Sequence, residues 1–324
     1  MNVLITGGAG FLGLQLARLL LQRGTLNLDG QPVVIQRLTL LDVVAPQGLD
    51  DARVRVVTGD LSDPGVLRQA IDTDTGAVFH LAAVVSGQAE ADFDLGMRVN
   101  LDASRALLET CRELGHQPRV LFTSSVAVYG GPLPPVVQDD TALSPQSSYG
   151  VQKAIGELLL TDYSRRGFVD GRVLRLPTIS VRPGKPNAAA SSFASGIIRE
   201  PLSGVGANCP VAPDTPLWLL SPRAAVAALV NGIELAGERL GNRRVVNLPG
   251  LSVTAAGMVD ALRRVAGDAV ADRVTWEREA RVENIVGTWP AAWNAERALA
   301  LGFQGDASFD AVIRAYMEDA GLGK

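Results

Sequence analysis

The first thirteen residues constrain the fold more than any other stretch of the chain. Residues 2–6 form a short apolar run typical of a buried parallel strand. A glycine turn follows, and residues 11–20 then have the spacing and composition of a helix. At this junction Gly7 allows a tight turn, Gly10 allows a phosphate to approach, and Gly13 lets the helix pack closely on the strand. The helix N-terminus would then present free N–H groups to that phosphate.

An acidic residue closes the second predicted strand and favours a dinucleotide site at this turn. Asp42 ends the apolar run at residues 38–42, later than the usual spacing of about 20 residues. We expect residues 26–36 to form a longer helix–strand connection. A carboxylate here would bind the adenosine ribose and repel a 2′-phosphate, so the predicted cofactor is NAD rather than NADP. Arg37 lies at the wrong end of the strand to change this preference. The alternative is a structural glycine turn with Asp42 as a helix cap.

Composition narrows the class of protein. The chain has 324 residues, a net charge of −4 and 47% hydrophobic residues, which argues against a nucleic-acid surface or a basic membrane patch. No run of about 18 apolar residues predicts a membrane span. Cys111 and Cys209 suffice for neither a disulfide framework nor a metal site. Because the first strand is predicted to begin at Asn2, we expect no targeting segment and a cytoplasmic location.

Strands and helices alternate along the chain, which predicts an α/β fold with a doubly wound parallel sheet. Further strands are predicted at residues 54–61, 77–83, 119–125, 171–176 and 244–248. Helices are predicted at residues 93–114, from residue 149, and at residues 222–235, 254–266 and 310–318. Ligands of such sheets bind at the carboxyl ends of the strands. The residues expected there are Gly10, Asp42, Asp60, Ala82 and Ser125.

The second half of the chain predicts a smaller C-terminal α+β substrate lobe. Residues 181–216 are rich in Pro, Gly, Ala, Ser and Asn, which predicts an irregular segment that leaves the sheet and could act as a lid. We therefore expect an NAD-binding Rossmann domain from residues 1–180 plus about 217–249. The substrate lobe would comprise about 181–216 plus 250–324.

Three side chains form the predicted catalytic group. Tyr149 and Lys153 stand four residues apart on a predicted helix, and Ser125 ends a predicted strand. A free tyrosine has a pKa near 10, and bringing it to about 7 takes roughly 4 kcal/mol. The Lys153 ammonium and the positive nicotinamide ring have the charge needed to lower it. Tyr149 would then take a hydroxyl proton while hydride leaves the same carbon, and Ser125 would hold the substrate oxygen. A solvated Tyr/Lys pair is the alternative.

The two histidines do not suggest a different chemistry. His80 lies within an apolar strand and is predicted to be a core residue with its hydrogen bonds satisfied. His116 follows Gly115 and is predicted to lie in the turn that ends a helix. Serine hydrolysis and metal catalysis therefore lack the residues they need.

Six stretches in the first 180 residues have a recognisable combined pattern. They are residues 6–13, 59–61, 80–83, 99–100, 123–130 and 149–153. With them the chain resembles the extended short-chain dehydrogenase/reductase family, in its NAD-dependent epimerase/dehydratase-like branch. The resemblance places Asp60 and Leu61 beside the adenine, Leu81 along the NAD channel and Pro177 near the nicotinamide. It also implies that Asn100 orders the active site. The full set of expected cofactor-binding residues is Gly7, Gly10, Phe11, Leu12, Gly13, Asp42, Asp60, Leu61, Leu81, Ala82, Asn100, Tyr149, Lys153 and Pro177.

Later stretches point to a small substrate. Residues 174–184, 191–193, 199–202, 289–290 and 300–303 resemble family members that oxidise the C2 hydroxyl of the sugar acid D-erythronate. Residues 181–216 also lack an obvious basic and aromatic pair for a uridine diphosphate. A small acid needs one cation and several polar donors. The candidate cation is Arg182, with Ser191 or Asn187 as donors beside Ser125 and Tyr149. Arg182 in a surface or inter-lobe ion pair is an equally acceptable interpretation.

The resemblance also implies an assembly and alternatives. The family commonly forms homodimers through a four-helix bundle, which here would use the helices at residues 100–114 and 149–166. One alternative function is a nucleotide-sugar 4-epimerase or dehydratase that keeps NAD tightly bound. Another is a dinucleotide-sensing regulatory protein, which would not need the Tyr149/Lys153 pair.

Overall fold

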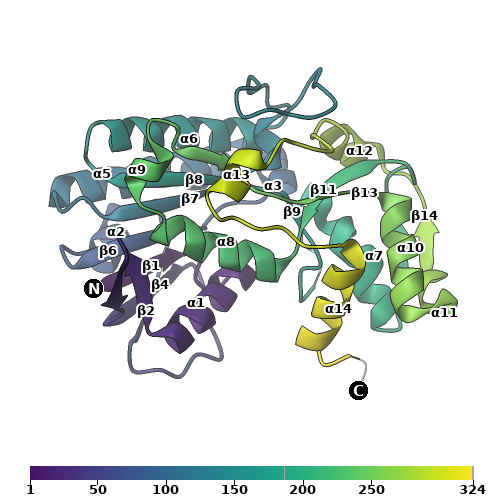
Figure 1. Ribbon diagram of the computed structural model, residues 1–324, viewed down its shortest axis with the longest axis horizontal. Helices are drawn as coiled ribbons and strands as arrows, with labels where there is room; N and C mark the ends of the chain where they lie inside the picture. Colours follow the sequence, from purple (N-terminus) through teal and green to yellow (C-terminus); the bar gives the residue numbers. More distant parts are fainter. Residues whose placement is uncertain (186, 323–324) are drawn as a thin grey trace.

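A computed structural model describes residues 1–185 and 187–322 and has a seven-stranded parallel sheet at its centre (Figure 1). The strand order is β12-β8-β7-β6-β1-β4-β5. These strands are β1 (Asn2–Thr6), β4 (Arg37–Asp42), β5 (Val54–Thr58), β6 (Thr75–His80), β7 (Arg119–Ser125), β8 (Asp170–Leu176) and β12 (Val245–Asn247). The doubly wound prediction is confirmed. After β1 the chain places β4 and β5 on one side of it, and then β6, β7, β8 and β12 on the other. The strand order therefore reverses between β1 and β6, and such folds bind ligands at this switch point.

Helices cover both faces of this sheet (Figure 1). One face carries α2 (Pro64–Ala70), α5 (Ala103–Leu114) and α6 (Ser148–Arg165), and the other carries α1 (Phe11–Arg23) and α8 (Pro222–Glu234). Alternate residues of β1 enter the two cores: Val3 and Ile5 pack on the α1 side, and Leu4 packs on the α5 side. Because both faces are covered, the strand is apolar throughout, as its sequence predicted.

An antiparallel hairpin explains the late position of the acid at Asp42. β2 (Thr25–Leu28) pairs with β3 (Gln31–Val34), and the chain then enters β4. The two turn residues, Asp29 and Gly30, have φ angles of 53° and 77°. An Asp-Gly pair at two positive φ angles is the preferred two-residue hairpin turn. The predicted long connection is therefore an inserted hairpin.

The predicted helix at residues 93–114 consists of three consecutive helical pieces. It begins with α4 (Phe93–Gly96), passes through a π-helical turn at Met97–Asp102 and continues as α5. The other short helical elements are α3 (Ser86–Ala91), Val126–Val128, Ala190–Ser192, α9 (Gly237–Leu240) and α13 (Glu296–Ala300). No described helix is both long enough and apolar enough to cross a membrane.

The second lobe combines two small sheets with helices. One sheet has the order β13 (Leu251–Thr254), β11 (Pro216–Leu220), β9 (Thr178–Ile179), and β10 (Ala207–Cys209) pairs with β14 (Val274–Trp276). The helices are α7 (Phe193–Leu202), α10 (Ala255–Ala266), α11 (Asp268–Ala271), α12 (Ala280–Val286) and α14 (Phe309–Asp319). The prediction of an irregular segment at residues 181–216 was wrong for α7. Its Ile197 and Ile198 are fully buried in the core of this lobe. This packing stabilises a helix that the many small and polar residues of the segment do not predict.

The hydrophobic cores of the large sheet and of the second lobe each contain residues from segments that alternate along the chain. Leu217 and Leu219 of β11 are buried in the second lobe, whereas Leu301 and Phe303, near the C-terminus, pack with the core of the large sheet. The predicted division at residues 180, 217 and 249 stays a prediction.

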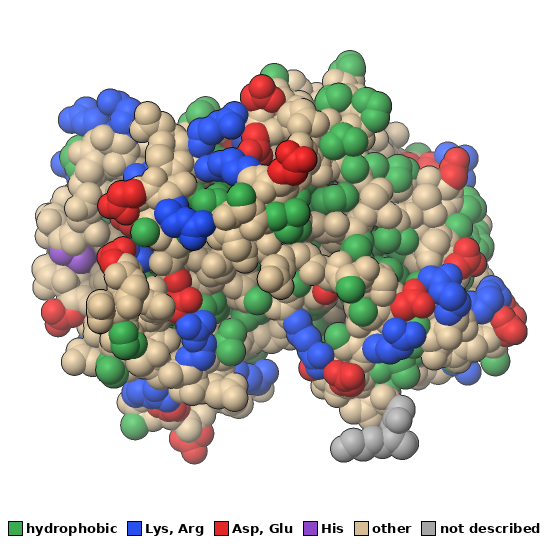
Figure 2. Space-filling view, in the orientation of Figure 1, with side chains coloured by type: hydrophobic (Ala, Val, Ile, Leu, Met, Phe, Trp, Pro, Cys, Tyr) green, Lys and Arg blue, Asp and Glu red, His purple; other side chains and the backbone are tan. Residues whose placement is uncertain are grey.

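A cavity lies where the two lobes meet, on the side of α1 and α14 (Figure 2). It is lined by residues of α1, α8 and α14, among them Arg18, Arg223 and Tyr316. Arg223 bridges the lobes by pairing with Asp319 at 2.6 Å and Glu318 at 3.0 Å. These exposed ion pairs link α8 to the end of α14 but add little stability individually.

Candidate active site

The glycine turn after β1 has the geometry of a phosphate cradle. Gly7 has a φ of +71°, in the left-handed region that favours glycine. A Cβ at Gly13 would lie less than 3.0 Å from the carbonyl oxygen of Gly7, a separation that real Cβ atoms essentially never show. Gly10 is the N-cap of α1, so the helix N-terminus opens onto the pocket beside it. The absence of side chains here fits a bound pyrophosphate.

One end of the site is a pocket at the carboxyl ends of β1, β4 and β5. Its predicted lining residues are Gly7, Gly10, Asp42, Asp60, Leu61, Leu81 and Ala82. Asp42 Oδ2 accepts a hydrogen bond from the backbone N–H of Ala9 at 2.9 Å, which ties the acid to the glycine turn. Hydrogen bonds from Ser62 hold the pKa of Asp60 below its usual value, so this carboxylate is ionised at neutral pH. A largely apolar slot with two acids in its lining, Asp42 and Asp60, fits an adenosine.

The other end is a pocket that is partly open to solvent and shares Gly7, Gly10 and Leu81 with the first. Together the two pockets form one groove across the switch point. The predicted residues that line this second end are Phe11, Leu12, Gly13, Ser125, Tyr149, Lys153, Pro177, Arg182, Asn187 and Ser191. Ser86, Thr123, Thr178 and Trp289 also line it and were not predicted. The structure thus brings the predicted catalytic group and the predicted substrate cation into one cavity.

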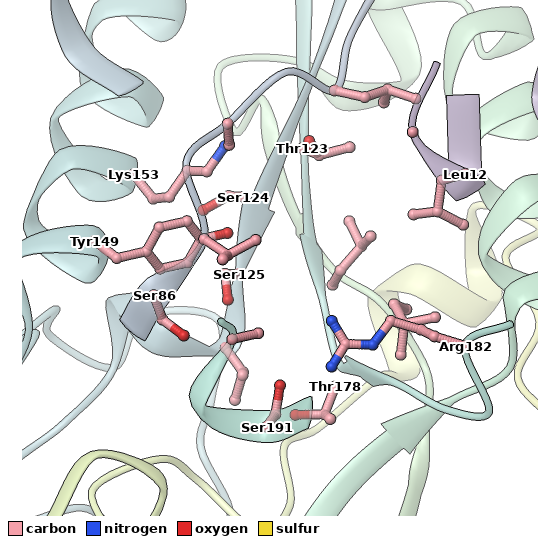
Figure 3. Close-up of a pocket in the computed structure, with 18 of the residues that line it drawn as sticks. Leu12, Ser86, Thr123, Ser124, Ser125, Tyr149, Lys153, Thr178, Arg182 and Ser191 are labelled. Carbon is pink, nitrogen blue, oxygen red and sulfur yellow. The ribbon is translucent and has the colours of Figure 1, made fainter. Parts of the chain in front are cut away.

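The start of α6 places Tyr149 beside Ser125. Ser147 caps the helix by accepting a hydrogen bond from the N–H of Gly150 at 3.2 Å. A Cβ at Gly150 would lie less than 3.0 Å from the carbonyl oxygen of Ala127, so a glycine lets the first turn pack against the chain that follows β7. Ser125 forms a hydrogen bond with Tyr149. Figure 3 shows Tyr149 and Lys153 entering the pocket from α6 and Ser125 standing next to the phenol.

The charge state of this group differs from the expectation. Burial raises the pKa of Tyr149 to about 12, and the Ser125 hydrogen bond and the charge of Arg182 only partly oppose that rise. Burial also lowers the pKa of Lys153 to about 7, against the attraction of Glu157. The Lys153 Nζ lies 5.7 Å from the centroid of the Tyr149 ring. In the protein alone, burial therefore outweighs the groups that favour the charged forms of Tyr149 and Lys153, and the lowering of the Tyr149 pKa by Lys153 stays a prediction.

Lys153→Met should make the protein alone more stable at neutral pH. The Lys153 pKa is about 7 when folded and 10.5 in its reference state. Between these values the unfolded chain binds more protons, so wild-type stability should rise with pH across that window. Met keeps the apolar stem without the charge, and should add up to about 4 kcal/mol at pH 7. Urea unfolding at pH 7 and pH 10 measures the effect, with the exposed Lys185→Met as control. A wild-type stability that is equal at both pH values would contradict the prediction.

A buried ionic network that was not predicted from the sequence supports α6, the helix that carries Tyr149 and Lys153. Glu157 of α6 is 2% exposed and accepts hydrogen bonds from Arg175 Nε at 2.8 Å and Nη2 at 2.6 Å. Ser124, adjacent to Ser125, also donates to Glu157. Arg175 continues to the hydroxyl of Tyr129, which donates to Asn247 at 3.1 Å. The available signal was the spacing of Glu157, four residues after Lys153 on the same helix face.

Asn100 lies behind the site and not on its walls. Its amide accepts from Val84 N at 2.8 Å and donates to Val84 O at 3.0 Å and to Gln152 Oε1 at 2.8 Å. It does not line either end of the groove. The structure therefore does not place Asn100 in contact range of a cofactor. It joins the chain after β6 to α6 through Gln152, which fits the ordering role implied by the resemblance.

Arg182 reaches the pocket from the wall opposite Tyr149 (Figure 3). Its Nη2 is buried and has no hydrogen-bond partner among the residues that the structure describes. Burial and the neighbouring Arg199 lower the pKa of Arg182 to about 10, which leaves it cationic at neutral pH. Within the described part of the chain Arg182 forms no ion pair, so that alternative finds no support. A desolvated cation facing a cavity is suited to bind an anionic ligand.

His80 is a core residue, as predicted. Its Nδ1 lies 2.7 Å from Thr6 Oγ1 and its Nε2 lies 2.8 Å from Ser104 Oγ. Ser104 donates its own proton to Asn100 O, so Nε2 is assigned the ring proton. Burial lowers the His80 pKa to about 3, and the ring is neutral. His116 follows Gly115, which has a φ of 69° at the end of α5, as predicted.

No group of His, Cys, Asp and Glu within residues 1–185 and 187–322 has the arrangement of a metal site.

Comparison with known proteins decides the family. A model of the NAD dependent epimerase/dehydratase family matches residues 3–214. The chain belongs to this family.

The epimerase/dehydratase relatives include proteins similar over the full length. The chain is 96% identical over 324 residues to a D-erythronate dehydrogenase of Cupriavidus necator, covering 100% of both. It is 47% identical over 319 residues to a D-erythronate dehydrogenase of Haemophilus influenzae, covering 98% of this chain and 99% of the relative. A solved structure, the nucleoside-diphosphate-sugar epimerase from Agrobacterium tumefaciens, has a TM-score of 0.92 at 43% identity, covering 100% of this chain and 95% of that one.

The predicted family, fold and cofactor are confirmed by these findings. The protein is an NAD-dependent oxidoreductase of the epimerase/dehydratase family. The roles of individual side chains stay predictions, which the geometry above supports to different degrees.

Proposed function

We propose that this enzyme oxidises the C2 hydroxyl of a short sugar acid, D-erythronate, to the 2-oxo acid. NAD⁺, when bound, supplies the hydride acceptor and a positive ring charge. One hydroxy acid and one NAD⁺ give one 2-oxo acid, one NADH and one proton. The relatives at 96% and 47% identity, both D-erythronate dehydrogenases, support this substrate.

Tyr149, Ser125 and Lys153 have different roles in the proposed reaction at C2. Tyr149 is the base that removes the hydroxyl proton, and Ser125 holds the same oxygen by a hydrogen bond. Lys153 lies one helical turn from Tyr149 and, when protonated, favours the phenolate. Because burial lowers the Lys153 pKa to about 7, only part of Lys153 is protonated at neutral pH, and only that form would favour the phenolate of Tyr149.

The placement of Arg182 is the observation that carries the assignment to an acid. Its guanidinium shares the cavity with Ser125 and Tyr149 and has a buried nitrogen without a partner among described residues. A substrate carboxylate is one carbon away from the C2 hydroxyl, so the cation and the base have to lie in one pocket. Ser191 and Asn187 line the same pocket and could bind the remaining hydroxyls.

The direct test is NADH formation. Purified protein is mixed with NAD⁺ and a series of four- to six-carbon aldonic acids at alkaline pH, and the absorbance of NADH is followed. We expect turnover with D-erythronate. Failure to oxidise any acid of the series would refute the proposal.

Arg182→Gln should raise KM for D-erythronate roughly a hundredfold, because an arginine–carboxylate pair in a desolvated site contributes about 3 kcal/mol. The KM for NAD⁺ should change little, since Arg182 does not line the adenosine end of the groove. Initial rates at varied substrate and cofactor measure both constants. Lys185→Gln, which removes an exposed charge from the same segment, is the matched control. An equal effect of the two substitutions would exclude a specific role for Arg182.

A nucleotide-sugar epimerase or dehydratase is the second candidate. The 43% identical structure is described as a nucleoside-diphosphate-sugar epimerase, which favours this alternative. Such an enzyme reuses its NAD within each cycle, so it should purify with the cofactor bound and release no net NADH. A protein free of bound NAD that accumulates NADH with an aldonic acid would exclude it.

We also propose a homodimer formed by α5 and α6. Leu158 and Val151 of α6 are 68% and 41% exposed, and Phe93 at the start of α4 is 59% exposed. Such large apolar side chains on neighbouring helices are suited to a helix-bundle interface.

A further inference from the structure

The strap, defined as residues 187–192, lies across the substrate end of the pocket. Its Asn187, Ala189 and Ser191 line the cavity. In Figure 3 Ser191 and Ser86 lie at the end of the pocket away from Leu12, which belongs to the cofactor side. The strap is therefore the wall that a longer substrate would meet after its carboxylate and C2 hydroxyl were bound.

Hydrogen bonds define the shape of the strap. Asn187 N donates to Ser192 Oγ at 3.2 Å, and Ala189 N donates to Asn187 Oδ1 at 3.1 Å. Ser192 N donates to Ala189 O at 2.9 Å. These bonds keep the strap compact, but they do not determine where it sits against the rest of the protein.

Its position is determined by contact with α3. Ala190 N donates to Ser86 Oγ at 3.1 Å. Next to this bond, the carbonyl oxygen of Ala188 packs directly on Gly87, which is buried. A Cβ at Gly87 would lie less than 3.0 Å from that oxygen, closer than real Cβ contacts allow. From α12, Arg281 donates to Gly87 O at 3.3 Å and joins a third segment to the junction.

The glycine is not explained by the helix in which it stands. Gly87 lies within α3, and a helical glycine costs about 0.5–1 kcal/mol relative to alanine. Its φ is not in the positive range that would require glycine. What alanine would disturb here is the backbone of the strap, and a backbone atom cannot move aside as the end of a flexible side chain can.

We propose that Gly87 is a specificity-determining residue that limits the length of the substrate. Because it has no side chain, the strap can lie against α3 and close the pocket beyond a four-carbon acid. Gly87 acts through the strap and is a positioning residue. This inference rests on the proposed oxidation of sugar acids and adds the reason why short acids are preferred.

The test compares the Gly87→Ala variant with wild type on D-erythronate and on the six-carbon acid D-gluconate. The displaced strap should raise KM for D-erythronate. It should also lower the ratio of kcat/KM for D-erythronate to kcat/KM for D-gluconate at least tenfold. The KM for NAD⁺ should stay unchanged. Gly196→Ala in α7, where the nearest contact of a new Cβ is an ordinary 3.6 Å to Glu200, is the matched control. Retention of the wild-type preference by Gly87→Ala would overturn the proposal.

Two further measurements keep the outcome decisive. Hydrogen exchange in peptides that span residues 187–192 should be faster in Gly87→Ala, whether or not the protein oxidises any acid. This measurement therefore tests the contact between Gly87 and the strap even if the protein oxidises no sugar acid. Unchanged hydrogen exchange in Gly87→Ala would refute this contact, whatever the result of the activity test. If Gly87→Ala does not fold, Arg281→Ala removes only the bond to Gly87 O and should shift the length preference two- to threefold in the same direction. No shift would overturn the inference.

Discussion

Tyr149→Phe should lower kcat for D-erythronate oxidation about a thousandfold while NAD⁺ binding is retained. The substitution removes only the phenolic oxygen, and general base catalysis contributes on the order of 10²- to 10⁴-fold. The ring stays in place, so the groove keeps its shape. Because burial raises the Tyr149 pKa to about 12, little phenolate exists at neutral pH in the protein alone. The wild-type rate should therefore increase as the pH rises above neutral.

Steady-state kinetics from pH 7 to pH 10 and a cofactor titration followed by fluorescence measure both effects. Tyr163→Phe is the matched control, since Tyr163 lies on the same helix and its hydroxyl binds Glu109 at 2.9 Å, away from the pocket. This variant should have a kcat close to that of wild type. A Tyr149→Phe enzyme that kept more than a tenth of the wild-type kcat would exclude Tyr149 as the base.

Glu157→Gln should destabilise the protein by about 3–5 kcal/mol. Removing one partner of a buried ion pair leaves the other charge without compensation, and the cost lies in this range. Arg175 is 7% exposed, and among the residues that the structure describes its other hydrogen-bond partners are the neutral oxygens of Tyr129 and Asn247. The same change weakens the hold on Ser124, which precedes Ser125, so a loss of kcat should accompany the loss of stability.

Urea unfolding gives the change in free energy, and the same helix provides the control. Asp162 pairs with Arg165 at 2.7 Å, but these side chains are 58% and 68% exposed. Asp162→Asn should therefore change stability by less than about 1 kcal/mol. Equal effects of the two substitutions would show that burial of the Glu157–Arg175 pair has no energetic consequence.

Local patterns were sufficient to predict the glycine turn after β1 and the acid that lies beside it. Gly7, Gly10 and Gly13 shape the turn through contacts with neighbouring backbone alone. Asp42 could be placed beside them because it ends β4, the strand that pairs with β1. Tyr149 and Lys153 were predicted to share a helix face because their spacing equals one turn, and α6 has them so. The Asp29-Gly30 hairpin is also encoded locally, since this dipeptide favours a two-residue turn, but it was not among our predictions.

Long-range packing supplied the rest. Arg175 and Asn247 join Glu157 and Tyr129 from strands that are far apart in sequence, and no periodicity relates them. Asn100 was expected among the cofactor contacts, but its hydrogen bonds to Val84 and Gln152 hold it behind the groove. The helix α7 forms because Ile197 and Ile198 are buried by other segments, an effect that composition does not reveal.

By itself, the sequence determined the parallel sheet, the glycine turn after its first strand and the placement of Tyr149 and Lys153 on one face of a helix. Each depends on residues close together in the chain, whose backbone preferences and spacing act locally. Only the tertiary structure decided the charge states of Tyr149 and Lys153, the burial of Arg182 Nη2 without a hydrogen-bond partner among the described residues, and the contact of Gly87 with the strap. These properties depend on how much water and which distant groups surround a side chain, and folding alone sets both.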